Sequence, residues 1–206
     1  MKVKICGITN LDDALLCESS GADALGFIFY RQSKRYIDFG DASYIVKRLS
    51  FFTNKVGVFV NEKEDMVNFL AEKLKLTGVQ LSGDESPEYV QRMNCQVIKS
   101  FRISNNFDYG IISNYKYTTP LLDTYSKNEY GGTGETFNWD SIPESLLRKI
   151  ILAGGVSEKN IEEIFCKYNP LSVDLSSSLE VKPGKKDEEK VKSFFNKINK
   201  LRSQSW

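Results

Sequence analysis

Two residues that could move protons end short apolar runs in this sequence. Cys6 ends the run Val3–Cys6, and Asp123 ends the run Pro120–Asp123. A thiol with a pKa of about 8.5 is partly thiolate near neutrality and can remove a carbon-bound proton. A desolvated carboxyl group has a raised pKa and can donate one. The pair predicts general acid–base catalysis, with Cys6 as the base and Asp123 as the acid. The alternatives are a buried structural cysteine and a turn or capping aspartate.

The absence of histidine narrows the possible chemistry. With His 0 among 206 residues, Ser–His and Cys–His mechanisms and imidazole metal sites are excluded. We therefore expect an enzyme without a metal or a cofactor, which uses carboxylates, thiols, Lys, Tyr or water. Cys17, Cys95 and Cys166 have no CxxC spacing and are assigned to packing, as reduced thiols.

Small and hydroxylic residues follow the last two apolar runs. Gly154 and Gly155 come after the seventh run, and Ser176 and Ser177 come after the eighth. Backbone N–H groups and hydroxyls in such loops frequently bind phosphate in eight-stranded α/β barrels. Glycine pairs also occur in ordinary turns, so the prediction of a phosphate site rests on both loops together.

Two loops offer further candidates. Arg35, in the segment RQSKRYI, could bind a substrate carboxylate through its guanidinium fork, or it could be an exposed loop charge. The glycine-rich segment Gly131–Gly134 lacks the spacing of a Walker sequence. It is either a mobile lid over the site or a plain flexible connection.

Repeated elements must position these residues. Short runs rich in Val, Ile and Phe alternate with segments of helical character, and their successive apolar residues indicate strands buried on both faces. The eight runs are Val3–Cys6, Ala24–Phe29, Val56–Val60, Gly78–Leu81, Gln96–Phe101, Pro120–Asp123, Ile150–Ala153 and Leu171–Leu175. This alternation predicts an α/β fold, a (β/α)8 barrel in a single domain over residues 1–206. An open doubly wound sheet is the alternative, but CGITN is not the GxGxxG spacing expected after its first strand.

In such a barrel the site lies at the carboxyl ends of the strands. Ser82, after the fourth run, and Asp174, in the eighth, would then join the candidates above. Asn10, Asn61 and Ser157 each precede acidic residues and are predicted to cap helices. The final helix is predicted from apolar residues at helical spacing, and the helix after the fifth run is the least regular.

Composition excludes several function classes. The formal net charge of +1, with Lys and Arg spread along the chain, does not match the basic stripe of a nucleic-acid-binding protein. No apolar run is long enough to span a bilayer, and no signal peptide precedes the first motif. We expect a cytoplasmic protein that acts on a small molecule, as a monomer or a homodimer.

The ordered motifs resemble the phosphoribosylanthranilate isomerase family of tryptophan biosynthesis. The motifs are KICGIT, GADALGFIF, SKRYI, VGVFVN, GVQLSGDE, LLDT, YGGTGETFNW, AGGVSEKN and VDLSSSLEVKPGKKD, from residue 2 to about residue 195. The resemblance implies a (β/α)8 barrel and an Amadori rearrangement of N-(5-phosphoribosyl)anthranilate.

The resemblance also implies a role for each residue that matches a functional position of the family. The family's catalytic cysteine falls on Cys6 as general base, and its catalytic aspartate falls on Asp123 as general acid. Its carboxylate-binding arginine falls on Arg35, and an aspartate that faces the site falls on Asp174. Its phosphate loops fall on the Gly154–Gly155 and Ser176–Ser177 segments.

Two positions depart from the family pattern. Ser82 stands where the family usually has histidine, and it could keep a hydrogen bond but not a charge. Ser178 stands where the family often has glycine, which matters if that position requires a positive φ. Two other functions are an isomerase of a different aminosugar phosphate and a catalytically weak binding protein descended from the family.

Overall fold

The fold is a closed barrel of eight parallel strands, as the sequence predicted. The structure is a computed structural model that describes residues 1–124 and 137–204. Hydrogen-bonded neighbours follow the order β1 to β8, and β8 closes on β1. The strands are β1 Lys2–Cys6, β2 Ala24–Ile28, β3 Asn54–Phe59, β4 Gly78–Leu81, β5 Gln96–Ile103, β6 Thr118–Thr124, β7 Ile151–Leu152 and β8 Ser172–Leu175. Each predicted run coincides with one strand to within a few residues.

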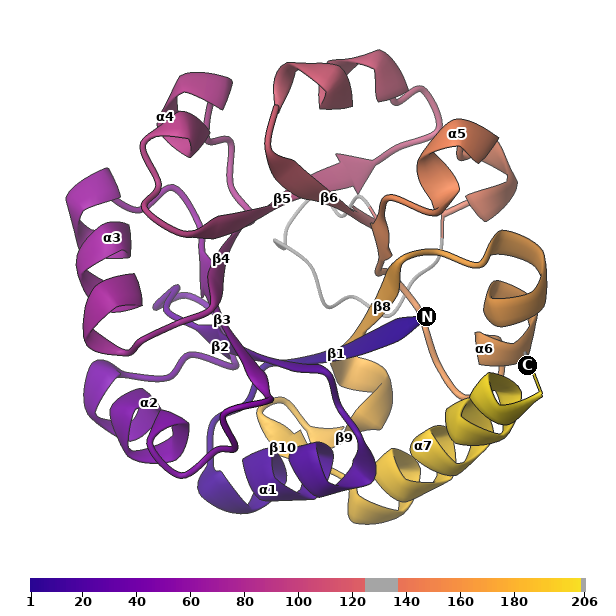
Figure 1. Cartoon of the computed structure of the whole chain (residues 1–206), viewed down its shortest axis with the longest axis horizontal. Coiled ribbons are helices and arrows are strands. Elements are labelled where there is room, and N and C mark those ends of the chain that lie inside the picture. Colours follow the sequence, from indigo (N-terminus) through magenta and orange to yellow (C-terminus); the bar gives the residue numbers. More distant parts are fainter. Residues whose placement is uncertain (125–136, 205–206) are drawn as a thin grey trace.

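Helices surround the barrel on its outside (Figure 1). The α-helices are α1 Leu11–Ser20, α2 Phe39–Val46, α3 Glu64–Lys73, α4 Pro87–Gln91, α5 Glu144–Leu147, α6 Ile161–Glu163 and α7 Glu188–Ser203. The shorter helical segments are η1 Tyr109–Asn114, η2 Trp139–Ser141, η3 Ile164–Tyr168 and η4 Ser177–Leu179. The segment after β5 is the 3-10 helix η1 and not a regular α-helix. No helix within 1–124 and 137–204 is long and apolar enough to cross a membrane.

The alternation of side chains along each strand separates two environments. Val3 and Ile5 of β1 belong to the large apolar core between the strands and the helices. Successive side chains of a strand point to opposite faces, so Lys4 and Cys6 face the inside of the barrel. Asp123 of β6 shares its side with Leu121, which belongs to a small separate cluster. The inside of the barrel is therefore partly polar.

The register between neighbouring strands fixes which inward residues meet. Lys4 pairs with Asp174 across the β1–β8 closure, and Cys6 pairs with Gly26 across β1 and β2. These pairings bring a lysine, an aspartate and a cysteine together from opposite ends of the chain.

A hairpin that the strand pattern did not predict lies between β8 and α7. It consists of β9 Glu180–Lys182 and β10 Lys185–Lys186. Nζ of Lys186 is buried and donates to the backbone oxygen of Cys6 at 2.7 Å and to Oε1 of Glu180 at 2.9 Å. The hairpin is thereby fastened to the carboxyl end of β1.

Of the three predicted helix caps, one is confirmed and two are wrong. Asn10 caps α1, as predicted, because its side chain accepts a hydrogen bond from the backbone N–H of Asp13. The predicted cap at Asn61 is wrong, because α3 begins after Lys63 and the Asn61 side chain accepts from the N–H of Asp84. The predicted cap at Ser157 is also wrong, because α6 begins only after Asn160.

The three remaining cysteines also differ from one another. Cys17 is buried and Cys95 is half-buried, which agrees with a role in packing. Cys166 is exposed on η3, so its assignment to packing is wrong. Cys166 lies in the π-helical segment η3, whose geometry the periodicity of the sequence did not indicate.

We predict that Asn10→Ala lowers the free energy of unfolding by about 1 kcal/mol, because the first turn of α1 loses its side-chain cap. Urea unfolding followed by circular dichroism measures this. Lys63→Ala is the matched control, because Lys63 occupies the same position at α3 without a side-chain cap bond. Equal losses in the two variants would contradict the role of Asn10.

Candidate active site

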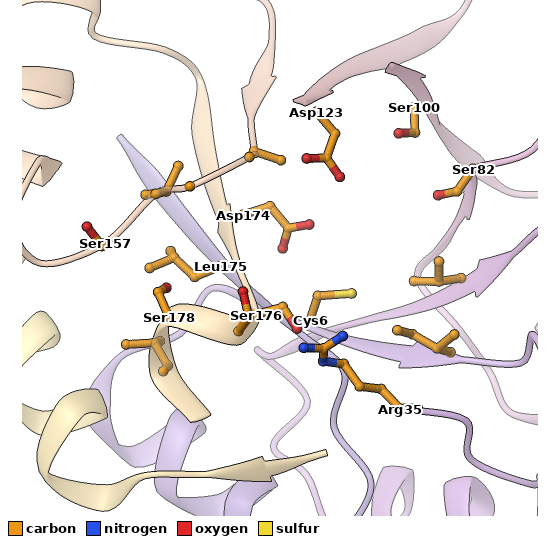
Figure 2. A pocket seen from close by; sticks show the side chains of 18 of the residues that line it. Cys6, Arg35, Ser82, Ser100, Asp123, Ser157, Asp174, Leu175, Ser176 and Ser178 are labelled. Carbon is orange, nitrogen blue, oxygen red and sulfur yellow. The ribbon is translucent and has the colours of Figure 1, made fainter. Parts of the chain in front are cut away.

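One cavity of about 580 Å³ opens at the carboxyl ends of the barrel strands. Every candidate site residue that lies within 1–124 and 137–204 lines it: Cys6, Arg35, Ser82, Asp123, Gly154, Gly155, Asp174, Ser176 and Ser177. Figure 2 shows the thiol of Cys6 and the carboxyl groups of Asp123 and Asp174 facing a common space. The glycine-rich segment Gly131–Gly134 lies outside the described residues.

Cys6 ends β1 inside the barrel. Its side chain is buried and lines the cavity. Burial raises the pKa of the thiol, and the nearby ammonium groups of Lys4 and Lys186 act in the opposite direction. Poor hydration makes a thiolate in this position a stronger base, and the fixed positive charges stabilise it so that a fraction of the thiol can ionise.

Asp123 is the last residue but one of β6 and lies on the other side of the cavity. Burial raises its pKa to about 6, against the N–H of Thr124, which donates to Oδ1 at 2.8 Å. Gly154 makes room for this carboxyl group: a Cβ atom there would lie 3.0 Å from Oδ1 of Asp123 and 2.7 Å from the backbone nitrogen of Thr124. The φ of +75° at Gly154 also favours glycine. A carboxyl group with this pKa can be protonated near neutrality and donate a proton.

Arg35 reaches the cavity from the loop after β2, and it is paired. Its Nε and Nη2 donate to the carboxylate of Glu180 on β9, with Nη2 at 2.8 Å from Oε2. Gly7 is required beside it, since a Cβ atom there would lie 2.6 Å from Cδ of Arg35. Glu180 therefore holds the guanidinium rigid and leaves Nη1 for a ligand. The pairing with Glu180 was not predicted from the sequence.

The loops after β7 and β8 face each other across the cavity. Gly154 and Gly155 contribute backbone groups, and the hydroxyl oxygens of Ser176 and Ser178 are buried without a hydrogen-bond partner among the described residues. Unpaired buried hydroxyls cost free energy unless a ligand satisfies them. The backbone of Ser178 does not have a positive φ, so serine meets no conformational penalty at this departure from the family pattern.

Ser82 takes the position after β4. It is buried and lines the cavity, and its Oγ accepts a hydrogen bond from Nε2 of Gln80 at 3.0 Å. Asp174 lies across the cavity with Oδ1 buried and without a partner among the described residues. Both side chains can therefore hydrogen-bond the hydroxyl groups of a ligand.

Sequence reasoning missed several residues at this site. Gln80, Ser100 and Arg102 line the cavity, and Lys4 contacts two residues that do. Gln80 and Lys4 could have been found from the sequence, since each lies two residues before a candidate, Ser82 and Cys6, and alternate side chains of a strand share a face. Ser100 and Arg102 had no such signal, because no candidate had been selected on β5. Lys190 of α7 also lines the cavity, but only the three-dimensional packing of the last helix brings it there. The described residues contain no group of three or more His, Cys, Asp or Glu side chains that could hold a metal ion.

Comparison with known proteins decides the family. The sequence model of N-(5'-phosphoribosyl)anthranilate (PRA) isomerase matches residues 3–197. The chain belongs to the PRA isomerase family. It is 43% identical to the N-(5'-phosphoribosyl)anthranilate isomerase of Trichlorobacter lovleyi, over 95% of this chain and 96% of that one. It is also 43% identical to the protein of that name from Thermotoga neapolitana, over 98% of this chain and all of that one.

Solved structures of the family share the fold. The phosphoribosyl anthranilate isomerase of Thermus thermophilus superposes with a TM-score of 0.89 at 36% identity, over 98% of this chain and 100% of that one. A PRA isomerase in complex with reduced 1-(o-carboxyphenylamino)-1-deoxyribulose 5-phosphate superposes with a TM-score of 0.84 at 38% identity, over 97% of this chain and 99% of that one. The resemblance on which the sequence analysis relied is thus confirmed.

The raised pKa of Asp123 predicts a pH-dependent stability effect. A carboxyl group whose pKa is about 6 in the folded protein and about 3.9 when unfolded favours folding fully below pH 4, and this advantage is lost as the pH rises through 6. Asp123→Asn should therefore raise the free energy of unfolding relative to wild type by roughly 1–3 kcal/mol at pH 7.5. The difference should shrink toward pH 4. Urea unfolding at both pH values measures it, and a difference that is independent of pH would contradict the assignment.

Proposed function

We propose that this protein converts N-(5'-phosphoribosyl)anthranilate to 1-(2-carboxyphenylamino)-1-deoxyribulose 5-phosphate, a step of tryptophan biosynthesis, with Asp123 as general acid and Cys6 as general base. One observation carries the proposal. The ends of β1 and β6, which lie far apart around the closed barrel, present a thiol and a carboxyl group with a raised pKa to the same cavity. An acid and a base on different sides of a bound sugar are what an Amadori rearrangement requires.

The first step opens the sugar ring. Asp123 in its protonated form donates to the furanose ring oxygen, the bond between that oxygen and C1 breaks, and the nitrogen lone pair forms a protonated Schiff base with C1. A pKa of about 6 supports this role, because a useful fraction of the carboxyl groups is protonated near neutrality and the proton is released readily.

The second step moves a proton from carbon. The Cys6 thiolate removes the proton from C2, and the electrons of the C2–H bond form the C1–C2 double bond of an enolamine while the Schiff base is neutralised. The enolamine then tautomerises: C1 gains a proton, and the hydroxyl group on C2 becomes the ketone. No redox step occurs, so the reaction needs no external electron acceptor or donor, and we propose that it needs no cofactor or metal.

The remaining cavity residues fit the other parts of the substrate. Nη1 of Arg35 is available for the anthranilate carboxylate, because Nε and Nη2 already bind Glu180. The loops with Gly154 and Gly155 and with Ser176 and Ser177 are assigned to the phosphate. The related structure in complex with a reduced 5-phosphate compound supports a phosphorylated ligand.

Ser82 and Asp174 are assigned to the sugar hydroxyl groups. Ser82 hydrogen-bonds Gln80 and faces the cavity, and Oδ1 of Asp174 is a buried acceptor without a partner among the described residues. The histidine that the family usually has after the fourth strand is thus replaced here by a neutral hydroxyl group, and the proposed acid and base remain in place.

We also propose a cytoplasmic location and action as a monomer or a homodimer. A base that works as a thiolate must stay reduced, which favours a reducing compartment. A related structure is described as monomers generated from the dimeric enzyme of Thermotoga maritima.

Replacing the acid or the base tests the mechanism. Cys6→Ser and Asp123→Asn should each lower kcat by about 10²–10⁴-fold, the usual loss when a positioned acid or base is removed. The conversion of the fluorescent anthranilate substrate by purified protein measures kcat. Cys166→Ser is the control for loss of a thiol, because Cys166 is exposed on η3. Near-normal turnover by Cys6→Ser would remove Cys6 as the base.

Replacing Arg35, the proposed carboxylate-binding residue, should weaken binding of the substrate. Arg35→Ala should raise KM by roughly 10–100-fold, the equivalent of one charge-assisted hydrogen bond, with a smaller effect on kcat. Arg31→Ala removes an exposed arginine from the same loop and should leave KM unchanged. Equal KM values in wild type and Arg35→Ala would place the anthranilate carboxylate elsewhere.

A further inference from the structure

A buried lysine joins the proposed base to a carboxylate of the cavity. Only 1% of the surface of Lys4 is exposed. Its Nζ donates to Oδ2 of Asp174 at 2.9 Å, and its positive charge acts on the neighbouring thiol of Cys6 and lowers the pKa of that thiol. A Cβ atom at Gly26 would lie 2.8 Å from Sγ of Cys6 and 3.2 Å from Nζ of Lys4, so glycine at this position allows the two groups to approach.

We propose that Lys4 is a positioning residue that stabilises the Cys6 thiolate and orients Asp174, so that one ammonium group serves the base and a substrate-binding carboxylate together. The inference rests on the proposed function, because it gives Lys4 its task in that reaction. Lys4 itself stays protonated throughout. When Cys6 takes the proton from C2 and becomes a thiol, Asp174 continues to balance the charge of Lys4.

The hydrogen bonds of Asp174 support this arrangement. Lys4 occupies Oδ2, which leaves Oδ1 buried in the cavity wall without a partner among the described residues. A buried carboxylate oxygen in this condition costs free energy until a donor reaches it. A sugar hydroxyl group in the cavity is such a donor, so the ion pair with Lys4 aims Asp174 at the ligand.

The charges around Cys6 predict opposite effects for the two partners. The charged groups that face it are Lys4 on its own strand, Asp174 on β8 and Lys186 on β10. β2 contributes Gly26 and no charge at this point. Loss of Lys4 leaves an uncompensated carboxylate beside the thiol and disfavours the thiolate. Loss of the Asp174 charge leaves an uncompensated ammonium group and favours it.

The rate of alkylation of Cys6 by iodoacetamide, measured against pH by mass spectrometry of its peptide, tests the inference without substrate. Lys4→Met should slow alkylation of Cys6 at pH 7 by about ten-fold or more, which corresponds to a rise of one unit in the thiol pKa. Asp174→Asn should accelerate it, with a thiol pKa below that of wild type. Mapping the peptide separates Cys6 from the exposed Cys166.

Lys2→Met is the matched control. Lys2 lies on the same strand, but its ammonium group is exposed and pairs with Asp23, so alkylation of Cys6 should stay at the wild-type rate. The inference is wrong if Lys4→Met and Asp174→Asn shift the thiol pKa in the same direction, or if neither shifts it. If Lys4→Met fails to fold, the Asp174→Asn variant is the test. Faster alkylation of Cys6 at pH 7 in that variant supports the inference, and an unchanged or slower rate overturns it.

Turnover of the anthranilate substrate by wild type, measured beside the alkylation of Cys6, separates this inference from the proposed function. If wild type does not turn over the anthranilate substrate, the proposed function fails whatever the alkylation results. If wild type turns over normally and the thiol pKa of Lys4→Met equals that of wild type, only the role of Lys4 fails.

Discussion

Closure of the barrel between β1 and β8 is the constraint on which the geometry of the site depends. The first and last strands pair with Lys4 opposite Asp174, and the alternation of side chains then turns Cys6 into the barrel next to them. A slip of one residue in this register would turn Lys4 and Cys6 toward the helices and Val3 and Ile5 into the cavity. The proposed base is therefore positioned by the same pairing that completes the fold.

Buried charges reinforce that geometry at the carboxyl ends of the strands. Lys4 pairs with Asp174, and Lys186 joins Glu180 to the backbone of Cys6. Glu180 in turn holds Arg35, so the proposed base and the proposed carboxylate-binding residue share one connected network. Buried ion pairs add little net stability compared with apolar packing, because desolvation offsets their attraction. Their presence beside the cavity therefore fits a task in positioning, and the hairpin β9–β10 is the element that connects the two halves of the network.

Much of this could be predicted from the sequence, and the limits have physical causes. The apolar runs identified the eight strands, and strand ends identified residues that meet in one cavity, because parallel strands in a barrel share an edge. The inward lysine was missed because a buried charge is uncommon and its partner, Asp174, lies at the other end of the chain. The pairing of Arg35 with Glu180 depends on long-range packing, which local patterns do not encode. The hairpin itself is local, but its attachment to Cys6 through Lys186 is long-range. The predicted helix caps at Asn61 and Ser157 are wrong because both residues make loop contacts instead. The Asn61 side chain accepts from the N–H of Asp84, and the N–H of Ser157 donates to the Asn160 side chain.

The proposed mechanism requires β1 and β6 to present a base and an acid to different sides of the same bound sugar. A crystal structure of this protein with reduced 1-(o-carboxyphenylamino)-1-deoxyribulose 5-phosphate tests it most directly. We expect the sugar between Cys6 and Asp123, with Sγ of Cys6 within about 4 Å of C2 and the phosphate on the loops after β7 and β8. A bound sugar whose C2 lies out of reach of Cys6, with another side chain against it, would exclude Cys6 as the base.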